Sequence, residues 1–146
     1  MALRFGKPED WAASVLAIYG NKIVLVRDPD YTDPKWKFPG GKRDTHDSTP
    51  RDTAHRELEE ETGLRPQNII ELSQFTSHRC VGRPNEHTCH FFLAVVDSLD
   101  ELSTIGDEGE EVEAIELSDL WEPDILPSHL RIIQAVMKQA RPLQAA

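Results

Sequence analysis

Positive charge is scarce in this sequence. Its 146 residues include 16 Lys and Arg against 26 Asp and Glu, which gives a formal net charge of -10. Such an excess of negative charge repels the phosphate backbone of nucleic acids and anionic lipid headgroups. Bulk binding to nucleic acid or to a membrane surface is therefore excluded. A small phosphorylated ligand is still compatible with the charge, because divalent cations can bridge two anions.

Cysteines and long apolar runs are also few. Only Cys80 and Cys89 are present, which is too few for a disulfide framework, and a reducing cytoplasmic setting is the simpler expectation. No apolar run approaches the roughly 18 residues of a membrane span. The run from Trp11 to Tyr19 is followed by Gly20-Asn21 and a second apolar run, not by a small-residue cleavage site, so we expect no secretory signal.

The remaining composition is sufficient for one folded domain. A chain of 146 residues with 38% apolar residues, including three Trp and five Phe, can bury a core. No repeat, linker or change of composition divides it, so we expect a single domain over residues 1–146. Strands mixed with two helices indicate an α/β layered fold.

Apolar patterning locates the expected elements. The predicted strands cover residues 12–19, 22–27, 36–38, 69–78, 87–97 and 112–117. The predicted helices cover residues 50–62 and 128–140, the second from apolar residues at helical spacing. The predicted loops are residues 28–35, 98–110 and the segment PGGKRDTHDST, residues 39–49.

The first predicted helix ends in an unusual charge cluster, RELEEETG, residues 56–63. Thr49 is a suitable N-cap before Pro50, and Gly63 is a typical helix stop.

Carboxylates near a helix C-terminus are unfavourable, as are like charges three and four positions apart. The side chains of Glu57, Glu60 and Glu61 nevertheless project to one side, whereas Glu59 points elsewhere. The cluster is either a solvated acidic face or a site for a hard divalent cation such as Mg²⁺ or Mn²⁺.

The wider segment GKRDTHDSTPRDTAHRELEEETGL, residues 41–64, resembles the Nudix box of the Nudix hydrolase superfamily. The family pattern is Gly, five residues, Glu, seven residues, then Arg-Glu-apolar-x-Glu-Glu-x-Gly-apolar. Every fixed position of the last part is matched, by Arg56, Glu57, Leu58, Glu60, Glu61, Gly63 and Leu64. The preceding WKFPGGK, residues 36–42, is similar to MutT-like members.

One position departs from the family pattern. The upstream Glu is replaced by Asp47, and eight residues instead of seven separate Asp47 from Arg56. The acid is shorter and the loop one residue longer, which puts the internal hydrogen bonds of this loop in doubt.

The resemblance implies a fold and an activity. The fold is an α/β/α sandwich with a mixed β-sheet, and the activity is metal-dependent hydrolysis of a nucleoside diphosphate linked to a group X. The MutT-like features favour a nucleoside triphosphate pyrophosphohydrolase that releases a nucleoside monophosphate and pyrophosphate, acting as a monomer or homodimer. The alternatives are hydrolysis of ADP-ribose, nucleotide sugars or dinucleoside polyphosphates, and a non-catalytic nucleotide sensor.

The resemblance also assigns residues to a metal site. Glu57, Glu60 and Glu61 hold Mg²⁺ or Mn²⁺, the Gly40 carbonyl joins them, and Arg56 orients the glutamates by ion pairing.

The resemblance also implies a further acid from a mobile loop after the box. Glu108 is the expected residue, as base or as extra metal ligand, with Glu111 and then Glu110 as alternatives. If none of these acts, the alternatives are an acid on another loop and Glu57 as base.

Three further residues are candidates for substrate contact. Arg27 and Lys42 are expected to approach phosphate, and Trp36 is expected to stack on a base. The alternatives are that both cations are merely solvated and that Trp36 packs in the core.

A second cluster of metal-ligating residue types follows the box. His78, Cys80, His87 and Cys89 are a zinc-compatible set across a predicted hairpin, although ordinary strand residues beside the cleft are the favoured interpretation.

Overall fold

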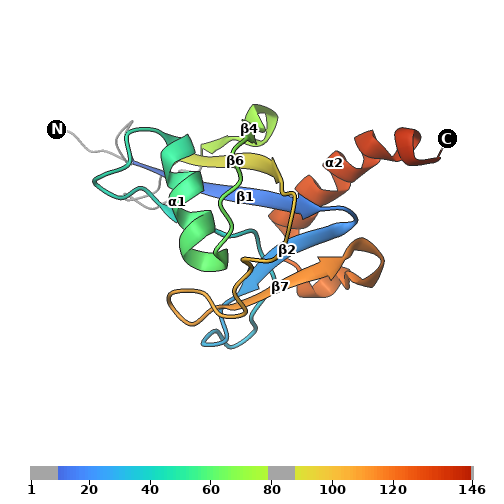
Figure 1. Ribbon diagram of the computed structural model, residues 1–146, viewed down its shortest axis with the longest axis horizontal. Helices are drawn as coiled ribbons and strands as arrows, with labels where there is room; N and C mark the ends of the chain where they lie inside the picture. Colours follow the sequence, from blue (N-terminus) through green and yellow to red (C-terminus); the bar gives the residue numbers. More distant parts are fainter. Residues whose placement is uncertain (1–9, 79–87, 146) are drawn as a thin grey trace.

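The computed structural model describes residues 10–78 and 88–145, which are built around a mixed seven-stranded sheet (Figure 1). The strands are β1 (Trp11–Tyr19), β2 (Lys22–Arg27), β3 (Gly40–Lys42), β4 (Ile69–Glu71), β5 (Ser77–His78), β6 (Thr88–Val95) and β7 (Glu111–Glu116). The helices are α1 (Pro50–Thr62) and α2 (Pro127–Ala145), with short 3₁₀ turns at Ser73–Phe75, Leu117–Asp119 and Glu122–Asp124. The sheet order is β4-β6-β1-β2-β7, with β3 added to β1 and β5 to β6. Strands β1 and β6 pair in parallel, and the other pairs among the described strands are antiparallel.

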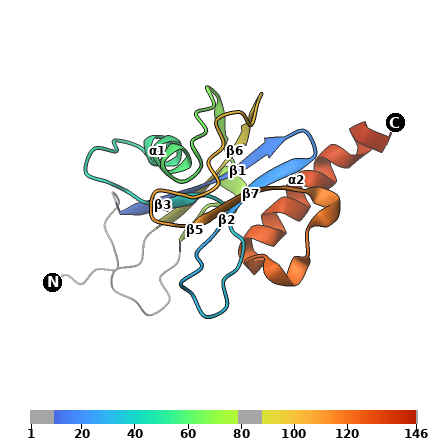
Figure 2. The ribbon, with the colours of Figure 1, turned by 60° about the horizontal axis from the view of Figure 1, so that its bottom comes forward.

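The two helices cover opposite faces of the sheet (Figure 2). Alternate residues of β1 face opposite sides, so Val15 packs with Leu58 of α1, and Leu16 belongs to the cluster that contains Ile133 of α2. Both apolar clusters are buried, which explains why the central strands β1 and β2 contain long apolar runs. The predicted α/β/α sandwich is confirmed.

The ends of α1 follow its sequence signals. Thr49 accepts a hydrogen bond from the Asp52 backbone N–H, and the Asp52 carboxylate accepts from the Thr49 backbone N–H, which together form a capping box. Gly63 ends the helix with a φ of 83°, a conformation that other residues adopt only with strain. The predicted bounds of this helix are confirmed.

The segment predicted as one loop after Phe38 contains strand β3, so that prediction was wrong. Gly40 and Gly41 pair with Ser14 and Ala13 of β1. The pairing is very close, since a Cβ on Gly40 would overlap the backbone of Ala13. Two glycines carry no apolar alternation, so the strand gave no signal in the sequence.

Other bounds also differ from the sequence prediction. Residues 36–38 form isolated bridges through Trp36 and Lys37 instead of a strand. The predicted strand 69–78 is divided into β4, a 3₁₀ turn and β5. Helix α2 extends beyond residue 140 to Ala145. No helix in the described part of the chain is both long enough and apolar enough to cross a membrane.

His129, in the first turn of α2, is a polar residue that points into the core. Its Nδ1 accepts a hydrogen bond from the Phe38 backbone N–H at 2.9 Å, and its ring stacks on Phe38 at 4.3 Å. Burial and, to a smaller extent, the charge of Lys37 together lower the pKa of His129 to about 4. His129 is therefore neutral at pH 7, and because Nδ1 is an acceptor, the proton resides on Nε2.

Acidification from pH 7 to pH 5 should lower the free energy of unfolding by about 2 kcal/mol through His129. The folded-state pKa of about 4 lies below the ordinary value of 6.5, so the unfolded chain binds the proton first. Stability is then lost as the pH falls from 6.5 towards 4. His129→Asn keeps an acceptor for the Phe38 N–H and does not titrate. Urea denaturation of both proteins at the two pH values measures the difference, and equal pH dependence would contradict the prediction.

Candidate functional site

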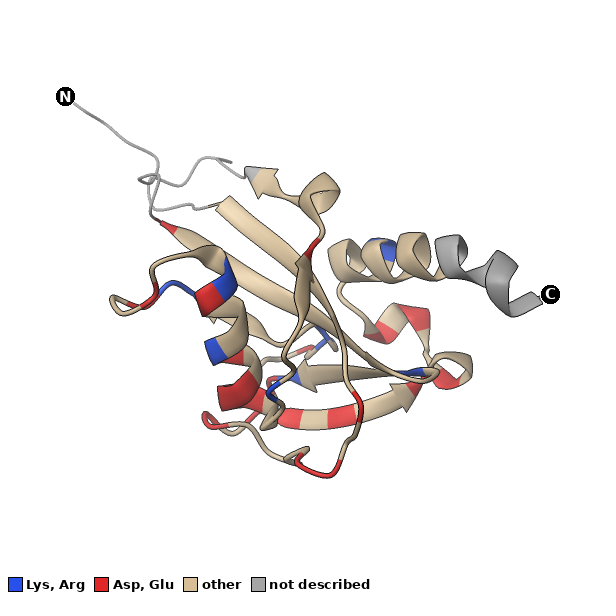
Figure 3. Cartoon of the chain, turned by 45° about the horizontal axis from the view of Figure 1, so that its top comes forward, with Lys and Arg blue, Asp and Glu red and all other residues tan. Residues whose placement is uncertain are grey.

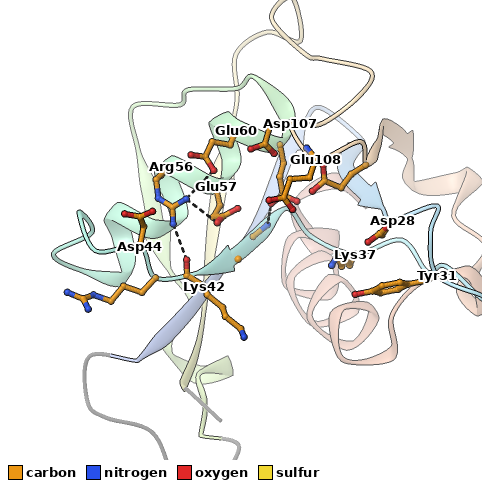
Figure 4. Close-up of a pocket in the computed structure, with 15 residues that line it drawn as sticks. Asp28, Tyr31, Lys37, Lys42, Asp44, Arg56, Glu57, Glu60, Asp107 and Glu108 are labelled. Carbon is orange, nitrogen blue, oxygen red and sulfur yellow. Dashed lines mark hydrogen bonds and ion pairs between the residues drawn. The ribbon is translucent and has the colours of Figure 1, made fainter. Parts of the chain in front are cut away.

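A polar cavity of about 500 Å³ lies at the C-terminal half of α1, between β3 and the loop that precedes β7 (Figure 4). Eight carboxylates line it: Asp28, Asp44, Glu57, Glu60, Glu61, Asp107, Glu108 and Glu110. Basic side chains line it too, namely Lys37, Lys42, Arg43 and Arg56. Acidic residues are concentrated over α1, this loop and β7 (Figure 3). The cavity is therefore strongly acidic, and a phosphorylated ligand needs compensating cations to enter it.

Strand β3 packs directly against the acidic side of α1. The Gly40 backbone N–H donates to Oε2 of Glu61 at 2.8 Å. A Cβ on Gly41 would overlap the Glu57 carboxylate, so the strand approaches the helix this closely only because it carries glycine. The glycine pair thus sets the positions of two of the three predicted metal ligands.

Glu57 and Glu61 are neighbouring carboxylates that share one small space, with Glu61 buried and Glu57 half-buried. Glu61 is only 4% exposed. Burial raises the pKa of Glu61 well above its usual range, and the carboxylates of Glu57 and Glu110 raise it further, against the Gly40 N–H. Burial likewise raises the pKa of Glu57, although Arg56 opposes the shift. Both can be ionised together only if a cation compensates them, which fits a divalent metal.

Arg56 holds the box loop and the glutamates together. Its guanidinium contacts Asp47 at 2.9 Å, Glu57 at 3.2 Å and Glu60 at 3.1 Å, and donates to the Lys42 carbonyl at 3.0 Å. These contacts fix the direction of the glutamate side chains.

Asp47 makes the contacts that its shorter side chain had put in doubt. It accepts hydrogen bonds from Thr53 Oγ1 at 2.8 Å, from the Asp44 N–H at 2.9 Å and from Arg56. Burial alone would raise the pKa of Asp47, but these hydrogen bonds lower it to about 2. Asp47 is thus an ionised anchor for Arg56.

The three glutamates do not all point to one spot in this conformation. Within residues 10–78 and 88–145, no three His, Cys, Asp or Glu side chains are arranged to hold a metal ion. The reason is that Glu60 turns to Arg56 and Glu61 turns to the Gly40 N–H. The oxygen-rich donor set still fits a hard cation, because such ions prefer carboxylate oxygens as ligands.

The loop before β7 brings Glu108 and Glu110 to the cavity, but not Glu111. Glu111 pairs with Arg27 at 2.6 Å. Asp107 also lines the cavity and was not predicted from the sequence.

The same loop is attached to the end of α1 by its backbone. The Ser103 N–H donates to the Thr62 carbonyl at 2.8 Å, and the Asp107 N–H to the Glu60 carbonyl at 3.2 Å. These bonds satisfy helix carbonyls that have no partner within the helix. The position of the loop is therefore set by backbone hydrogen bonds.

The predicted substrate contacts are only partly brought to the cavity. Lys42 lines it, with its side chain directed away from the glutamates (Figure 4). Arg27 does not line it, since its guanidinium pairs with Glu111 and lies 4.3 Å from the ring of the buried Trp36. Lys37 and Tyr31 line the cavity and were missed.

The zinc-compatible set stays untested. Cys80 and His87 lie outside the described residues, whereas His78 and Cys89 are on the paired strands β5 and β6.

Comparison with known proteins decides the family. The profile described as NUDIX domain matches residues 8–136. The chain belongs to this family. It is thus a Nudix hydrolase, a class of pyrophosphohydrolases whose members generally use divalent metals. The comparison with curated proteins gives no match.

Solved Nudix structures share the fold at low sequence identity. A MutT from a study of Aliivibrio salmonicida and Vibrio cholerae has a TM-score of 0.67 and 21% identity, covering 89% of this chain and 98% of that one. The NUDIX domain of Shewanella oneidensis NrtR, complexed with ADP ribose, has a TM-score of 0.67 and 20% identity, covering 88% and 86%. A bifunctional NMN adenylyltransferase/ADP ribose pyrophosphatase from Francisella tularensis, complexed with AMP and Mn ion, has a TM-score of 0.65 and 22% identity, covering 91% and 42%.

Proposed function

We propose that this Nudix hydrolase, as a single domain over residues 1–146, cleaves nucleoside triphosphates to a nucleoside monophosphate and pyrophosphate. The observation that carries the proposal is the pair of neighbouring carboxylates, half-buried Glu57 and buried Glu61, beside β3 in a cavity open to a ligand. Burying two like charges side by side destabilises a fold unless a cation joins them. A site that holds cations beside an open cavity is suited to binding and cleaving a phosphate chain.

The metal ligands in this proposal are Glu57, Glu60, Glu61 and the Gly40 carbonyl, with Mg²⁺ or Mn²⁺ as the ion. When bound, the ion neutralises phosphate charge and makes a water more acidic. Arg56 orients Glu57 and Glu60 through its two ion pairs.

The remaining residues act on the water and the substrate. The Glu108 carboxylate accepts the proton of the attacking water, whose oxygen joins a phosphorus atom as the phosphoanhydride bond breaks. Lys42 approaches the phosphates from the rim. Arg27, with Trp36 beneath it, reaches the substrate only after its ion pair with Glu111 opens.

A second cavity offers space for the nucleoside at the other end of the proposed substrate. It measures about 680 Å³, and its lining includes Phe75, Phe91 and His129. Ser14 lines this cavity, and its partner across the β1–β3 pairing, Gly40, lines the acidic one. Aromatic walls next to a phosphate site suit a base.

ADP-ribose, nucleotide sugars and dinucleoside polyphosphates are the second candidate substrates. The Shewanella oneidensis NUDIX domain with bound ADP ribose shares the fold, which supports including them. A third candidate is a sensor that binds a nucleotide without turnover.

A panel assay tests these alternatives. Phosphate or pyrophosphate release is measured with Mg²⁺ and with EDTA, over the common nucleoside triphosphates, ADP-ribose, a nucleotide sugar and a dinucleoside tetraphosphate. We expect Mg²⁺-dependent release of pyrophosphate from at least one triphosphate. Activity on the other classes alone would replace the substrate assignment, and no activity on any compound would favour the sensor.

Glu108→Gln should lower kcat by roughly ten- to a thousandfold on the best substrate, with KM little changed, because the carboxylate acts on the chemical step. Glu110→Gln and Glu111→Gln are measured beside it. The charge of Glu110 raises the pKa of Glu61, so Glu110 belongs to the same group of carboxylates. A large effect at Glu110 with none at Glu108 would move the base to Glu110. No effect at any position would assign that role to an acid on another loop or to Glu57.

A further inference from the structure

We propose that Lys37 is a substrate-binding residue that holds the phosphate chain from the side of the cavity opposite Arg56. The proposal rests on the proposed nucleotide hydrolysis and adds a residue that the Nudix box does not contain. Figure 4 shows Lys37 beside Asp28 and Tyr31, away from Arg56 and Glu57.

The backbone of Lys37 is held on both sides. Its N–H donates to the Val26 carbonyl and its carbonyl accepts from the Val26 N–H, both at 2.9 Å. The neighbours Trp36 and Phe38 are 7% and 1% exposed, and both belong to the core cluster beneath α2. In extended backbone, successive side chains point to opposite faces, so Lys37 must face the acidic cavity. The direction of this side chain is therefore imposed by the core.

The two arginines of the cavity are already engaged by other groups. Arg56 is engaged by Asp47, Glu57 and Glu60. Arg43 donates to the Asp47 carbonyl and lies over the Trp11 ring.

The two lysines of the cavity differ in exposure and in direction. Lys42 is exposed and points away from the glutamates (Figure 4). Lys37 is half-buried, and within the described residues its ammonium forms no ion pair. A half-buried ammonium without a paired anion is unfavourable in the free protein, and a phosphate oxygen would compensate it.

A phosphate chain in this cavity would thus lie between two sources of positive charge. Cations held by the glutamates act from the α1 side, and the ammonium of Lys37 acts from the β2 side. An ammonium contacts phosphate as a point charge, so it attracts the chain before and during bond cleavage alike. Such uniform binding changes KM and leaves kcat nearly unaltered.

Lys37→Met tests this with a side chain of similar length and no charge. On the best triphosphate of the panel, we expect KM to rise at least fivefold and kcat to change less than about threefold. Lys37→Arg should restore most of the affinity, because the charge is kept. Lys35→Met is the matched control: Lys35 contacts the Pro123 carbonyl and Asp33, outside the cavity, so its loss should leave KM within about twofold.

Direct binding separates this proposal from the proposed function. Isothermal titration calorimetry with magnesium pyrophosphate requires no turnover, and Lys37→Met should weaken its affinity at least fivefold while Lys35→Met does not. Thermal unfolding confirms that each variant is folded, with Lys37→Gln as substitute if Lys37→Met is not. In one outcome, the wild type hydrolyses no compound of the panel while Lys37→Met binds pyrophosphate more weakly than the wild type does. That result would refute the enzyme proposal alone. Unchanged KM and unchanged pyrophosphate affinity in folded Lys37→Met would overturn the role of Lys37.

Discussion

Replacing Glu61 with Gln should lower kcat at least a hundredfold and leave the protein folded. The substitution keeps size and an oxygen that can accept from the Gly40 N–H, but removes the charge that holds a cation. Folding should not suffer, since Glu61 is buried beside Glu57 and Glu110 and their repulsion is relieved. Steady-state kinetics with saturating Mg²⁺ and a thermal unfolding curve measure both effects.

Glu59→Gln is the matched control for that experiment. Glu59 is on the same helix but is exposed, and its ion pair with Arg65 is long, at 3.7 Å. Its kcat should stay within about twofold of wild type, because it is outside the cavity. If Glu61→Gln retained most of the activity, the assignment of Glu61 to the metal site would be wrong.

Asp47→Asn should lower the free energy of unfolding by about 3 kcal/mol, the usual order when one partner of a buried ion pair is removed. Asp47 is 4% exposed and accepts from Arg56, Thr53 and the Asp44 N–H. The amide of Asn would place an N–H donor opposite groups of Arg56, Thr53 and Asp44 that are themselves donors. Urea denaturation at pH 7 measures the loss.

Activity should fall with the Asp47 substitution as well, because Arg56 loses the anchor that fixes Glu57 and Glu60. Asp97→Asn, the same change at an exposed position, should alter stability by less than about 0.5 kcal/mol. A loss below 1 kcal/mol in Asp47→Asn would show that the extended loop tolerates an unpaired Arg56, against the structure-based expectation.

The sequence predicted well those features that depend on local chemistry. Thr49, Asp52 and Gly63 determine the ends of α1 through bonds within a few residues, so a capping pattern is enough to locate them. The apolar run of β1 is an equally local signal. The clustering of Glu57 and Glu61 was predicted from helical spacing alone, and both line the same cavity.

Features that depend on contacts between distant segments were not predictable in the same way. Strand β3 exists because Gly40 and Gly41 fit between β1 and α1, which no pattern within β3 indicates. The separation of Glu111 from the cavity depends on Arg27, 84 positions away. Lys37 was not predicted as a site residue. Its direction follows from the burial of Trp36 and Phe38 on either side.

The attachment of the loop at 103–107 to the end of α1 has a consequence for how the site can change during evolution. The loop is held by main-chain groups, which every residue type except proline supplies. Mutations at Asp107, Glu108 and Glu110 can therefore exchange or relocate an acid while the loop keeps its place. These are three acids within four positions, so the loss of one carboxylate leaves two others in the same loop. The identity of the acting acid can drift from one position to the next without an inactive intermediate, whereas Glu61, fixed against Gly40, has no such freedom.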